Sequence, residues 1–508
     1  MEKSSGVPPH IFVFFTGAAV MATEMSASRF IAPWFGTSMI VWSVLISVVL
    51  AAMSLGYWYG GKLADRKPSW RVLHLLPLVT GMLIALIPFL GRMIFSALAA
   101  GIRGTPVNIL VLSFVGIIAV FVPPVFLLAM VSPFVVKLLA RAENTGRTAG
   151  SLYAMSTLGS IFGTLVPTLL TIPWLGTRET LFLCSGMLII LGGLGLRGKR
   201  ALALSLVIVP ISGWLLSGSG IKSTAHVVHE EESLYQYLQV QQRDDGTTLL
   251  IVNEGGAMQS IARENDVLNP ASTYYESYLL LPYMGSFADG PDVLVIGAGG
   301  GTIPHWLAVY VEPCFSGMDI DAVEIDPRAS ELGYEYFGGS SDEYTTHEAD
   351  GRIFIESAED NWDIIITDTY SNQIYIPFHL TTLEYFQALR DHLNPGGIIA
   401  MNVNAINESS QLLASVGATV AEVFPYVYRV PVANDYNYMV IASDYPLHAP
   451  PPDSFPDWNP WLQYTAQLFQ PAFEPFPPGN GMILTDNRAP VEFMTDVMIA
   501  QGASEESR

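Results

Sequence analysis

The chain has 508 residues and a formal net charge of -22, and that charge is divided unevenly. Residues 1–220 carry 15 Lys and Arg against 5 Asp and Glu, whereas the rest carries 9 against 41. The acidic second half is unsuited to holding nucleic acid phosphates and suited to attracting cations, so no nucleic-acid partner is expected. Two cysteines form no disulfide framework, and no spacing of Cys, His and acidic residues predicts a metal site.

The first half is dominated by apolar stretches. A helix needs about 20 apolar residues to cross the hydrocarbon core of a membrane. About seven stretches come near this length: 11–33, 40–61, 72–98, 108–138, 149–173, 180–196 and 201–217. The fourth carries Pro123 and Pro124 and is expected to be kinked or split. We therefore predict a multi-pass helical domain over residues 1–220, in the cell (inner) membrane.

The charged loops bear on the orientation of this domain. The segments DRKPSWR (65–71) and RGKR (197–200) are the most basic short loops, and the positive-inside rule places both in the cytoplasm. With seven helices, that rule leaves the acidic second half outside the cell. A cofactor made in the cytoplasm requires the opposite. We expect a cytoplasmic second half, in conflict with the loop charges.

Two further features of the first half concern its interior. Glu24 and Arg29 lie within the first apolar stretch, where charges are costly unless they are paired or line a cavity. An ion pair to another helix and a role in a membrane cavity are the two interpretations. The small-residue stretches SLGYWYGG (54–61) and STLGSIFG (156–163) predict close approach of helices.

The second half changes to strands, turns and helices. YQYLQVQQ, a turn at 244–246 and TTLLIVN predict a β-hairpin, within a small region over residues 221–285 that ends in a helix at about 274–284. Strands and helices then alternate over residues 286–508. That alternation predicts a Rossmann-like, doubly wound α/β domain with largely parallel strands.

Glycines and carboxylates follow successive strands of this domain. The loop after VLVI contains Gly297, Gly299 and Gly301, which would let the backbone approach part of a nucleotide. Glu324 ends the next strand, where an acidic residue suits ribose hydroxyls, and Asp350 with Gly351 follows the third. Each carboxylate could alternatively cap a helix. Because no third glycine follows at the phosphate-binding spacing, an adenosyl sulfonium is expected in place of a dinucleotide.

A fourth strand, in DIIITD, ends at Asp368. Open α/β sheets bind ligands at the carboxyl ends of their strands. A carboxylate there could remove a proton from an amine, or it could only cap the following loop.

Together these motifs resemble the spermidine synthase family of aminopropyltransferases over residues 230–400. The whole chain resembles bacterial proteins that fuse a multi-helix membrane domain to such a unit; YGGKLADR (59–66), SLYAMSTLGSIFGT (151–164) and LTDNRAPVE (484–492) carry that likeness. The resemblance implies decarboxylated S-adenosylmethionine as co-substrate, no prosthetic group, a diamine such as putrescine as acceptor, and a homodimer. It implies that Asp368 is the catalytic base.

The resemblance also assigns binding residues. Those implied for the donor are Gln236 in ESLYQ, the glycine loop, Glu324, Asp350 and Gly351. Those implied for the acceptor amine are Gln259 in MQS and Tyr274 in YYE. Family members usually carry an aspartate in the glycine loop, where this chain has only small residues and Thr302. They usually carry a second aspartate three residues after the base, where this chain has Ser371. Tyr275, Glu276 and Tyr375 are candidates for replacement contacts.

The predicted function is that of a membrane-bound transferase of polyamine biosynthesis, which makes spermidine or a related polyamine. Two alternatives stay open. One is an S-adenosylmethionine-dependent methyltransferase, which the two absent carboxylates favour. The other is a polyamine transporter or sensor with a degenerate synthase domain, in which Glu24 and Arg29 would be pathway residues.

Overall fold

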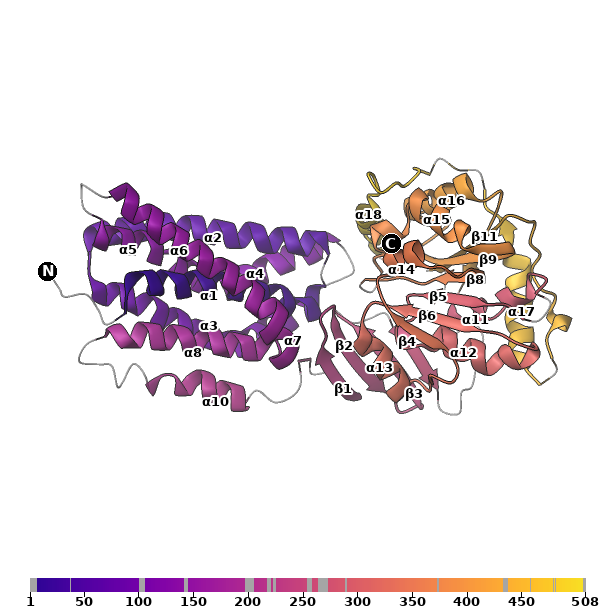
Figure 1. The fold of residues 1–508 in the computed structure, drawn as a ribbon, viewed down its shortest axis with the longest axis horizontal. Helices are drawn as coiled ribbons and strands as arrows, with labels where there is room; N and C mark the ends of the chain where they lie inside the picture. The colour runs from indigo at the N-terminus through magenta and orange to yellow at the C-terminus, as the bar shows by residue number, and fades with distance from the viewer. Residues whose placement is uncertain are drawn as a thin grey trace. The chain divides into compact units, whose positions relative to one another are not determined.

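A computed structural model of the chain describes residues 7–36, 38–99, 106–140, 145–196, 205–216, 221–222, 225–253, 258–263, 273–287, 290–371, 374–432, 437–456, 458–477, 479 and 481–505. These residues form two compact units, a helical unit up to residue 222 and an α/β unit from residue 225 on (Figure 1).

The helical unit contains six helices that are long and apolar enough to cross a membrane. They are α1 (Pro9–Phe35), α2 (Met39–Arg66), α3 (Trp70–Ala99), α4 (Pro106–Ala129) continued by α5 (Val131–Leu139), α6 (Thr145–Val166) continued by the π-helical η1 (Pro167–Thr171) and α7 (Ile172–Leu175), and α8 (Thr177–Gly195). The prediction of several long apolar helices in this part of the chain is confirmed.

The count of about seven helices stays a prediction, because residues 201–204 and 217 of the seventh apolar stretch lie outside the described residues. The described part of that stretch contains α10 (Ile208–Leu216). The fourth stretch is split, as the sequence predicted. The break falls at Met130, between α4 and α5, whereas Pro123 and Pro124 lie inside α4.

Glycines let the helices approach closely, as the sequence predicted. A Cβ atom on Gly159 or Gly163 of α6 would overlap the carbonyl oxygen of Phe14 or of Ala18 in α1. On α2, a Cβ atom on Gly56 would come within 2.5 Å of the Phe126 carbonyl oxygen. Backbone-to-backbone contact therefore joins α1 to α6 and α2 to α4.

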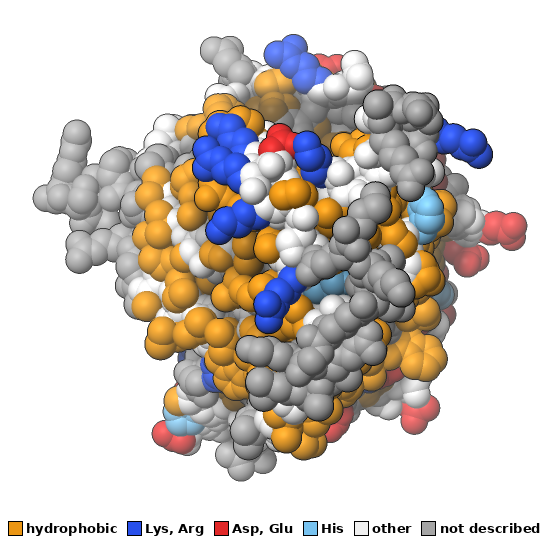
Figure 2. Space-filling model, turned by 90° about the vertical axis from the view of Figure 1, so that its left-hand side faces the viewer, with side chains coloured by type: hydrophobic (Ala, Val, Ile, Leu, Met, Phe, Trp, Pro, Cys, Tyr) orange, Lys and Arg blue, Asp and Glu red, His pale blue; other side chains and the backbone are white. Residues whose placement is uncertain are grey.

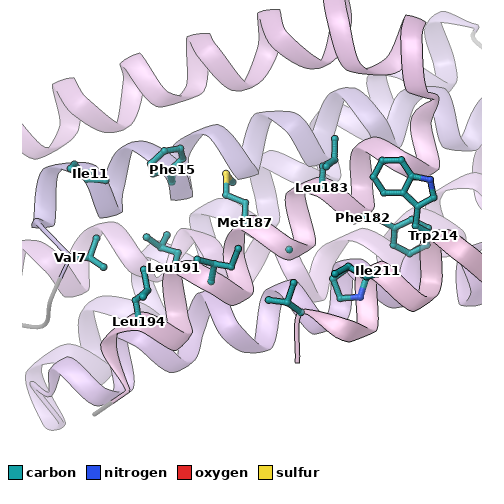
Figure 3. Close-up of a pocket in the computed structure, with 14 residues that line it drawn as sticks. Val7, Ile11, Phe15, Phe182, Leu183, Met187, Leu191, Leu194, Ile211 and Trp214 are labelled. Carbon is teal, nitrogen blue, oxygen red and sulfur yellow. The ribbon is translucent and has the colours of Figure 1, made fainter. Parts of the chain in front are cut away.

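The helical unit also has an apolar groove of about 530 Å³ between α1, α8 and α10 (Figure 3). Its lining is predominantly apolar and runs from Val7 and Leu194 to Phe182 and Trp214, whose indole N–H is the one polar side-chain group among the described lining residues.

The α/β unit begins with a four-stranded antiparallel sheet in the order β1 (Val227–Glu232), β2 (Tyr237–Gln242), β3 (Thr247–Val252) and β4 (Met258–Arg263). The predicted hairpin is the β2–β3 pair, in which Gln242 lies opposite Thr248. The helix predicted at about 274–284 is interrupted. That segment forms α11 (Tyr275–Tyr278) and a 3-10 turn, η3 (Leu281–Tyr283), because Pro282 has no N–H to continue the helical hydrogen bonds.

The main sheet has eight strands in the order β12-β10-β11-β9-β8-β5-β6-β7. Five of them pair in parallel: β5 (Val293–Ile296), β6 (Ile320–Glu324), β7 (Thr345–Glu348), β8 (Trp362–Thr367) and β9 (Leu393–Asn404). The antiparallel strands are β10 (Tyr426–Val432), β11 (Asn437–Ser443) and β12 (Glu474–Pro475). The predicted doubly wound architecture is confirmed.

Helices accompany the strands: α12 (Thr302–Tyr310), α13 (Pro327–Tyr336), α14 (Gly351–Ser357), α15 (Leu383–Asp391), α16 (Gln411–Val423), α17 (Pro460–Ala472) and α18 (Val491–Glu505). Strand β5 is apolar on both faces of the sheet, so both faces are packed against other elements. Val293 and Val295 belong to one apolar core, and Leu294 and Ile296 belong to the other. A strand buried on both faces reads as a continuous apolar run.

Candidate active site

The strand order reverses between β5 and β8, which are neighbours in the sheet. Ligands of open α/β sheets bind at the carboxyl ends of the strands beside such a switch point. The glycine loop follows β5, and Asp368 follows β8. A Cβ atom on Gly297 would come within 2.5 Å of the Asp368 carbonyl oxygen, so the loop and the aspartate lie against each other.

Three glycines give this loop its course. Gly297, Gly299 and Gly301 have φ angles of 86°, 57° and 82°, which side chains other than glycine rarely adopt. Gly301 is also the residue before α12, and a Cβ atom there would overlap the hydroxyl of Tyr344. Both the backbone conformation and the crowding require glycine.

Asp368 is 8% exposed and is held by two side chains. The Tyr274 hydroxyl donates to Oδ2 at 2.8 Å, and Nδ2 of Asn402 donates to Oδ1 at 3.0 Å. Burial raises the pKa of Asp368 to about 6, because it penalises the charged carboxylate, while both hydrogen bonds lower it. A carboxylate with that pKa is mostly ionised at neutral pH and accepts a proton more readily than an ordinary aspartate.

Strand β4 covers the glycine loop. The Gly300 N–H donates to Oγ of Ser260 at 2.7 Å. The Thr302 hydroxyl accepts from the Ile261 N–H at 2.8 Å and donates to the Ile261 carbonyl at 2.9 Å. The partly buried Gln259 precedes these contacts, and its carbonyl oxygen would lie 3.1 Å from a Cβ atom on Gly299. The small antiparallel sheet therefore forms a wall over the loop.

Glu324, at the end of β6, bonds to that loop. Its Oε2 accepts from the Gly299 N–H at 2.7 Å, and its Oε1 accepts from the Asp326 N–H at 3.0 Å. Burial raises the pKa of Glu324, and the two backbone hydrogen bonds oppose the rise. A ribose contact would have to use the lone pairs that these two bonds leave.

Asp326 is a site residue that sequence reasoning missed. It is fully buried, accepts from the Ser233 hydroxyl at 2.6 Å, and bonds to the side chain of Gln236. It also caps α13 by accepting from the Arg328 N–H. These contacts tie the segment before β2 to the sheet. An aspartate directly before Pro327 was an available signal for the cap, but not for the contact with Gln236.

Asp350 makes the contacts of a helix cap, the alternative that the sequence left open. Its Oδ1 accepts from the N–H groups of Arg352 and Ile353 at 2.9 and 3.1 Å, at the start of α14. Its Oδ2 lies 3.4 Å from Nε2 of His379. A Cβ atom on Gly351 would overlap a methyl group of Ile296, so glycine is needed for packing. Contact of either residue with adenine stays a prediction.

The three candidate replacement contacts bond to other protein groups. Glu276 is 1% exposed, accepts from the Thr273 hydroxyl and lies 3.8 Å from Nη1 of Arg263. The Tyr375 hydroxyl donates to Asp496 at 2.7 Å. The Tyr275 hydroxyl donates to the carbonyl of Met258 at 3.4 Å.

Asn402 and Asn437 were also missed from the sequence. Asn402 lies in β9, is 2% exposed, and its Oδ1 accepts from Nδ2 of Asn437 at 2.8 Å. The signal available was the pair of asparagines in MNVN, since polar residues are unusual in a strand that is otherwise buried. Among the residues that the structure describes, no three His, Cys, Asp or Glu side chains are grouped to hold a metal ion.

Comparison with known proteins identifies the family. The model of the spermine/spermidine synthase domain matches residues 275–444. A polyamine aminopropyltransferase from Vibrio vulnificus is 30% identical over 224 residues, which cover 43% of this chain and 71% of that protein. This chain belongs to the spermine/spermidine synthase family.

Other relatives match a smaller share of the chain or match it at lower identity. A probable polyamine aminopropyl transferase from Bifidobacterium longum is 34% identical over 201 residues, 39% of this chain, so the chain spans 42% of that relative's length. Polyamine aminopropyltransferase 2 from Ralstonia nicotianae is 22% identical over 463 residues, 85% of this chain and 86% of that protein. The human eEF1A lysine and N-terminal methyltransferase is 30% identical over 166 residues, 30% of this chain and 23% of that protein.

A solved structure, a probable spermidine synthase from Corynebacterium glutamicum, aligns with a TM-score of 0.36 at 20% identity and covers 44% of this chain and 81% of its own.

Proposed function

We propose that the chain is a membrane-anchored aminopropyltransferase that transfers an aminopropyl group from decarboxylated S-adenosylmethionine to a diamine such as putrescine. The observation that carries the proposal is Asp368, a buried carboxylate with a pKa of about 6 that accepts from Tyr274 beside the glycine loop. Membership of the synthase family and the names of the relatives support the same activity.

The reaction needs a base and alignment. An aliphatic amine has a pKa near ~10.4 and is protonated at neutral pH, so it must lose a proton before it attacks carbon. The amine nitrogen forms a bond to the methylene carbon, the carbon–sulfur bond breaks, and the sulfonium leaves as a neutral thioether. Asp368 accepts the proton that the amine releases. Tyr274 holds the carboxylate in place, so that the remaining work is alignment of nitrogen, carbon and sulfur.

Donor binding is assigned to residues at or after the ends of β5, β6 and β7, together with Gln236 from the segment before β2. These are Gln236, Gly297, Gly299, Gly301, Glu324, Asp350 and Gly351. Backbone of the glycine loop would lie against the adenosyl group, with Glu324 at the ribose and the Asp350–Gly351 turn at the adenine. The buried carboxylates of this edge suit a cationic sulfonium.

Acceptor binding is assigned to Gln259, Tyr274, Tyr275, Glu276 and Tyr375. Thr302 and Ser371 hydrogen-bond to backbone carbonyls and carry no charge, so neither offers a carboxylate to an ammonium group. Glu276 would hold an ammonium group only by sharing its carboxylate with Arg263 and Thr273. A Glu276→Gln variant with unchanged KM for the amine would remove this assignment.

The helical unit is proposed to anchor the enzyme in the inner membrane as part of a homodimer, with the α/β unit in the cytoplasm, where the donor is made. One end of the helical unit presents the six exposed cations Lys62, Arg66, Lys67, Arg71, Lys137 and Arg147, with Asp65 ion-paired to Lys137 at 2.6 Å. Figure 2 shows Lys and Arg side chains gathered at that end. This arrangement suits anionic lipid headgroups.

The anchor orientation has a direct test. Single cysteines introduced at exposed positions of the α/β unit, such as Ser357, are treated in whole cells with a membrane-impermeant maleimide. Protection until the cells are opened supports a cytoplasmic α/β unit. Labelling in intact cells would place that unit outside, as the positive-inside rule applied to seven crossings requires.

A methyltransferase is the second candidate, because the human relative named for methyl transfer matches 30% of this chain at 30% identity. The uncharged side chains of Thr302 and Ser371 favour the same alternative. Purified protein in detergent would be given decarboxylated S-adenosylmethionine or S-adenosylmethionine, each with putrescine. Mass spectrometry then separates spermidine and methylthioadenosine from methylated amine and S-adenosylhomocysteine.

A further inference from the structure

Two hydrogen bonds connect Asp368 to strand β11 through side-chain amides. Nδ2 of Asn402 donates to Oδ1 of Asp368 at 3.0 Å, and Nδ2 of Asn437 donates to Oδ1 of Asn402 at 2.8 Å. The same Nδ2 of Asn437 also donates to Oδ1 of Asn404 at 2.8 Å. Asn437 is partly exposed, whereas Asn402 and Asp368 are buried.

The ionised carboxylate fixes the direction of this chain of bonds. A carboxylate only accepts hydrogen bonds, so Asn402 must present its NH2 group to Asp368 and its oxygen to Asn437. Asn437 has two N–H bonds, one for each of the two neighbouring amide oxygens. Asn437 therefore stabilises the one orientation of the Asn402 amide in which its donor faces the carboxylate.

The backbone leaves little other freedom to Asn402. Strands β9 and β11 pair antiparallel, with Asn437 opposite Asn404 and Met439 opposite Asn402. The Tyr370 hydroxyl donates to the Asn402 carbonyl at 3.0 Å and accepts from the Asn404 N–H at 3.1 Å. With its backbone held on both sides, the amide of Asn402 retains mainly a rotation that exchanges its oxygen and nitrogen.

We propose that Asn437 is a positioning residue, which holds the Asn402 amide in the orientation that stabilises ionised Asp368 and so keeps Asp368 available as a base at neutral pH. The proposal rests on the proposed role of Asp368. In this proposal, Asn437 of β11 controls the proton affinity of Asp368 through Asn402, without bonding to Asp368 itself.

The test is an Asn437→Asp variant in the full-length protein. A carboxylate at position 437 accepts but does not donate, so the Asn402 amide turns its NH2 group toward position 437 and its oxygen toward Asp368. The acid limb of the pH profile of kcat/KM should move up by about one unit, which is roughly a tenfold loss on that limb. Turnover should approach that of wild type at alkaline pH, and KM for the amine should stay unchanged at pH values above the limb.

An Asn437→Leu variant separates amide orientation from added charge. It removes both N–H donors without adding a carboxylate, and we expect a shift in the same direction but smaller. Asn404→Leu is the matched control, because it removes the other acceptor of Asn437 and leaves the Asn437–Asn402 bond; it should not move the acid limb. Thermal unfolding of each variant checks that the fold is intact.

A readout without turnover keeps this inference separate from the proposed activity. The carboxyl band of Asp368, taken as the infrared difference between wild type and Asp368→Asn, titrates directly with pH. Its midpoint should rise in both Asn437 variants. An unchanged midpoint in both would overturn the positioning role even in an active enzyme, whereas a raised midpoint in a protein without aminopropyl transfer would refute only the proposed function.

Discussion

The phenol of Tyr274 donates to Oδ2 of Asp368 at 2.8 Å, across two segments that lie 94 residues apart in the chain. The one segment is the turn before α11, and the other is the end of β8. The contact places a donor on one oxygen of a buried carboxylate, while Asn402 holds the other. Both bonds stabilise the ionised form that a general base requires.

Removal of the phenol should therefore make Asp368 harder to ionise. In Tyr274→Phe, the loss of the hydrogen bond raises the pKa of Asp368 above about 6. The acid limb of kcat/KM should move to higher pH, with a loss of about tenfold near pH 6. Tyr334→Phe serves as control, because that hydroxyl pairs with Thr346 on an exposed surface. A Tyr274→Phe profile that overlays wild type would show that the bond does not tune the base.

Asp368 should also lower stability at neutral pH. Its pKa is about 6 in the folded protein, against a value near 3.9 for an unperturbed aspartate, so the folded state binds the proton more tightly. The stability that protonated Asp368 provides is present below the unfolded pKa and is lost as pH rises through about 6. A difference of about two pKa units between the folded and unfolded states corresponds to a change of about 2–3 kcal/mol in the free energy of unfolding.

Asp368→Asn, which carries no charge, should accordingly unfold at a higher temperature than wild type at pH 8. That advantage should disappear at pH 4. Scanning calorimetry of the full chain in detergent measures both, and Asp360→Asn, at an exposed position just before β8, should show no such difference. A lower unfolding temperature for Asp368→Asn at pH 8 would contradict the burial argument.

The glycine loop offers a matched pair of substitutions. Gly301 and Gly396 have φ angles of 82° and 89°, but only a Cβ atom on Gly301 meets a neighbour, the hydroxyl of Tyr344. Gly396→Ala should cost the backbone strain alone, about 1–2 kcal/mol. Gly301→Ala should cost more and should weaken binding of the adenosyl donor, measured by isothermal titration. Equal effects on stability and no effect on binding would show that the loop does not need its close packing.

The helical unit has a similar pair on α6. A Cβ atom on Gly163 would overlap the carbonyl oxygen of Ala18, whereas one on Gly150 has no neighbour within 4 Å. Gly163→Leu should separate α1 from α6 and lower the yield of folded protein in detergent by several-fold, and Gly150→Leu should be tolerated. Fluorescence-detected size exclusion measures both, and equal yields would contradict the close packing of these helices.

Much of the fold was predictable because periodic apolar patterns carry it. Strand β8 follows directly from its run of isoleucines, whereas the strand order that places its end at the switch point is a finding of the structure. The helix expected at 274–284 is interrupted after Tyr278, because Pro282 provides no N–H to continue it, a signal that the sequence carried.

The site was predictable only at its strand ends. Asp368 and the glycines occupy positions that the βα pattern itself marks. Asn402 and Asn437 lie on strands that are antiparallel neighbours, and that pairing depends on tertiary structure. Asp326 likewise pairs with Ser233, which is 93 residues away in the chain. Contacts of this kind have no local sequence signal.

Turnover tests the central claim most directly. Purified full-length protein in detergent would be incubated with decarboxylated S-adenosylmethionine and putrescine, and mass spectrometry would measure spermidine and methylthioadenosine in wild type, Asp368→Asn and Asp360→Asn. We predict both products in wild type and Asp360→Asn, and a loss of about 10²–10⁴-fold in Asp368→Asn with donor binding retained. Products at the wild-type rate in Asp368→Asn, or no products from wild type that binds the donor, would contradict the account.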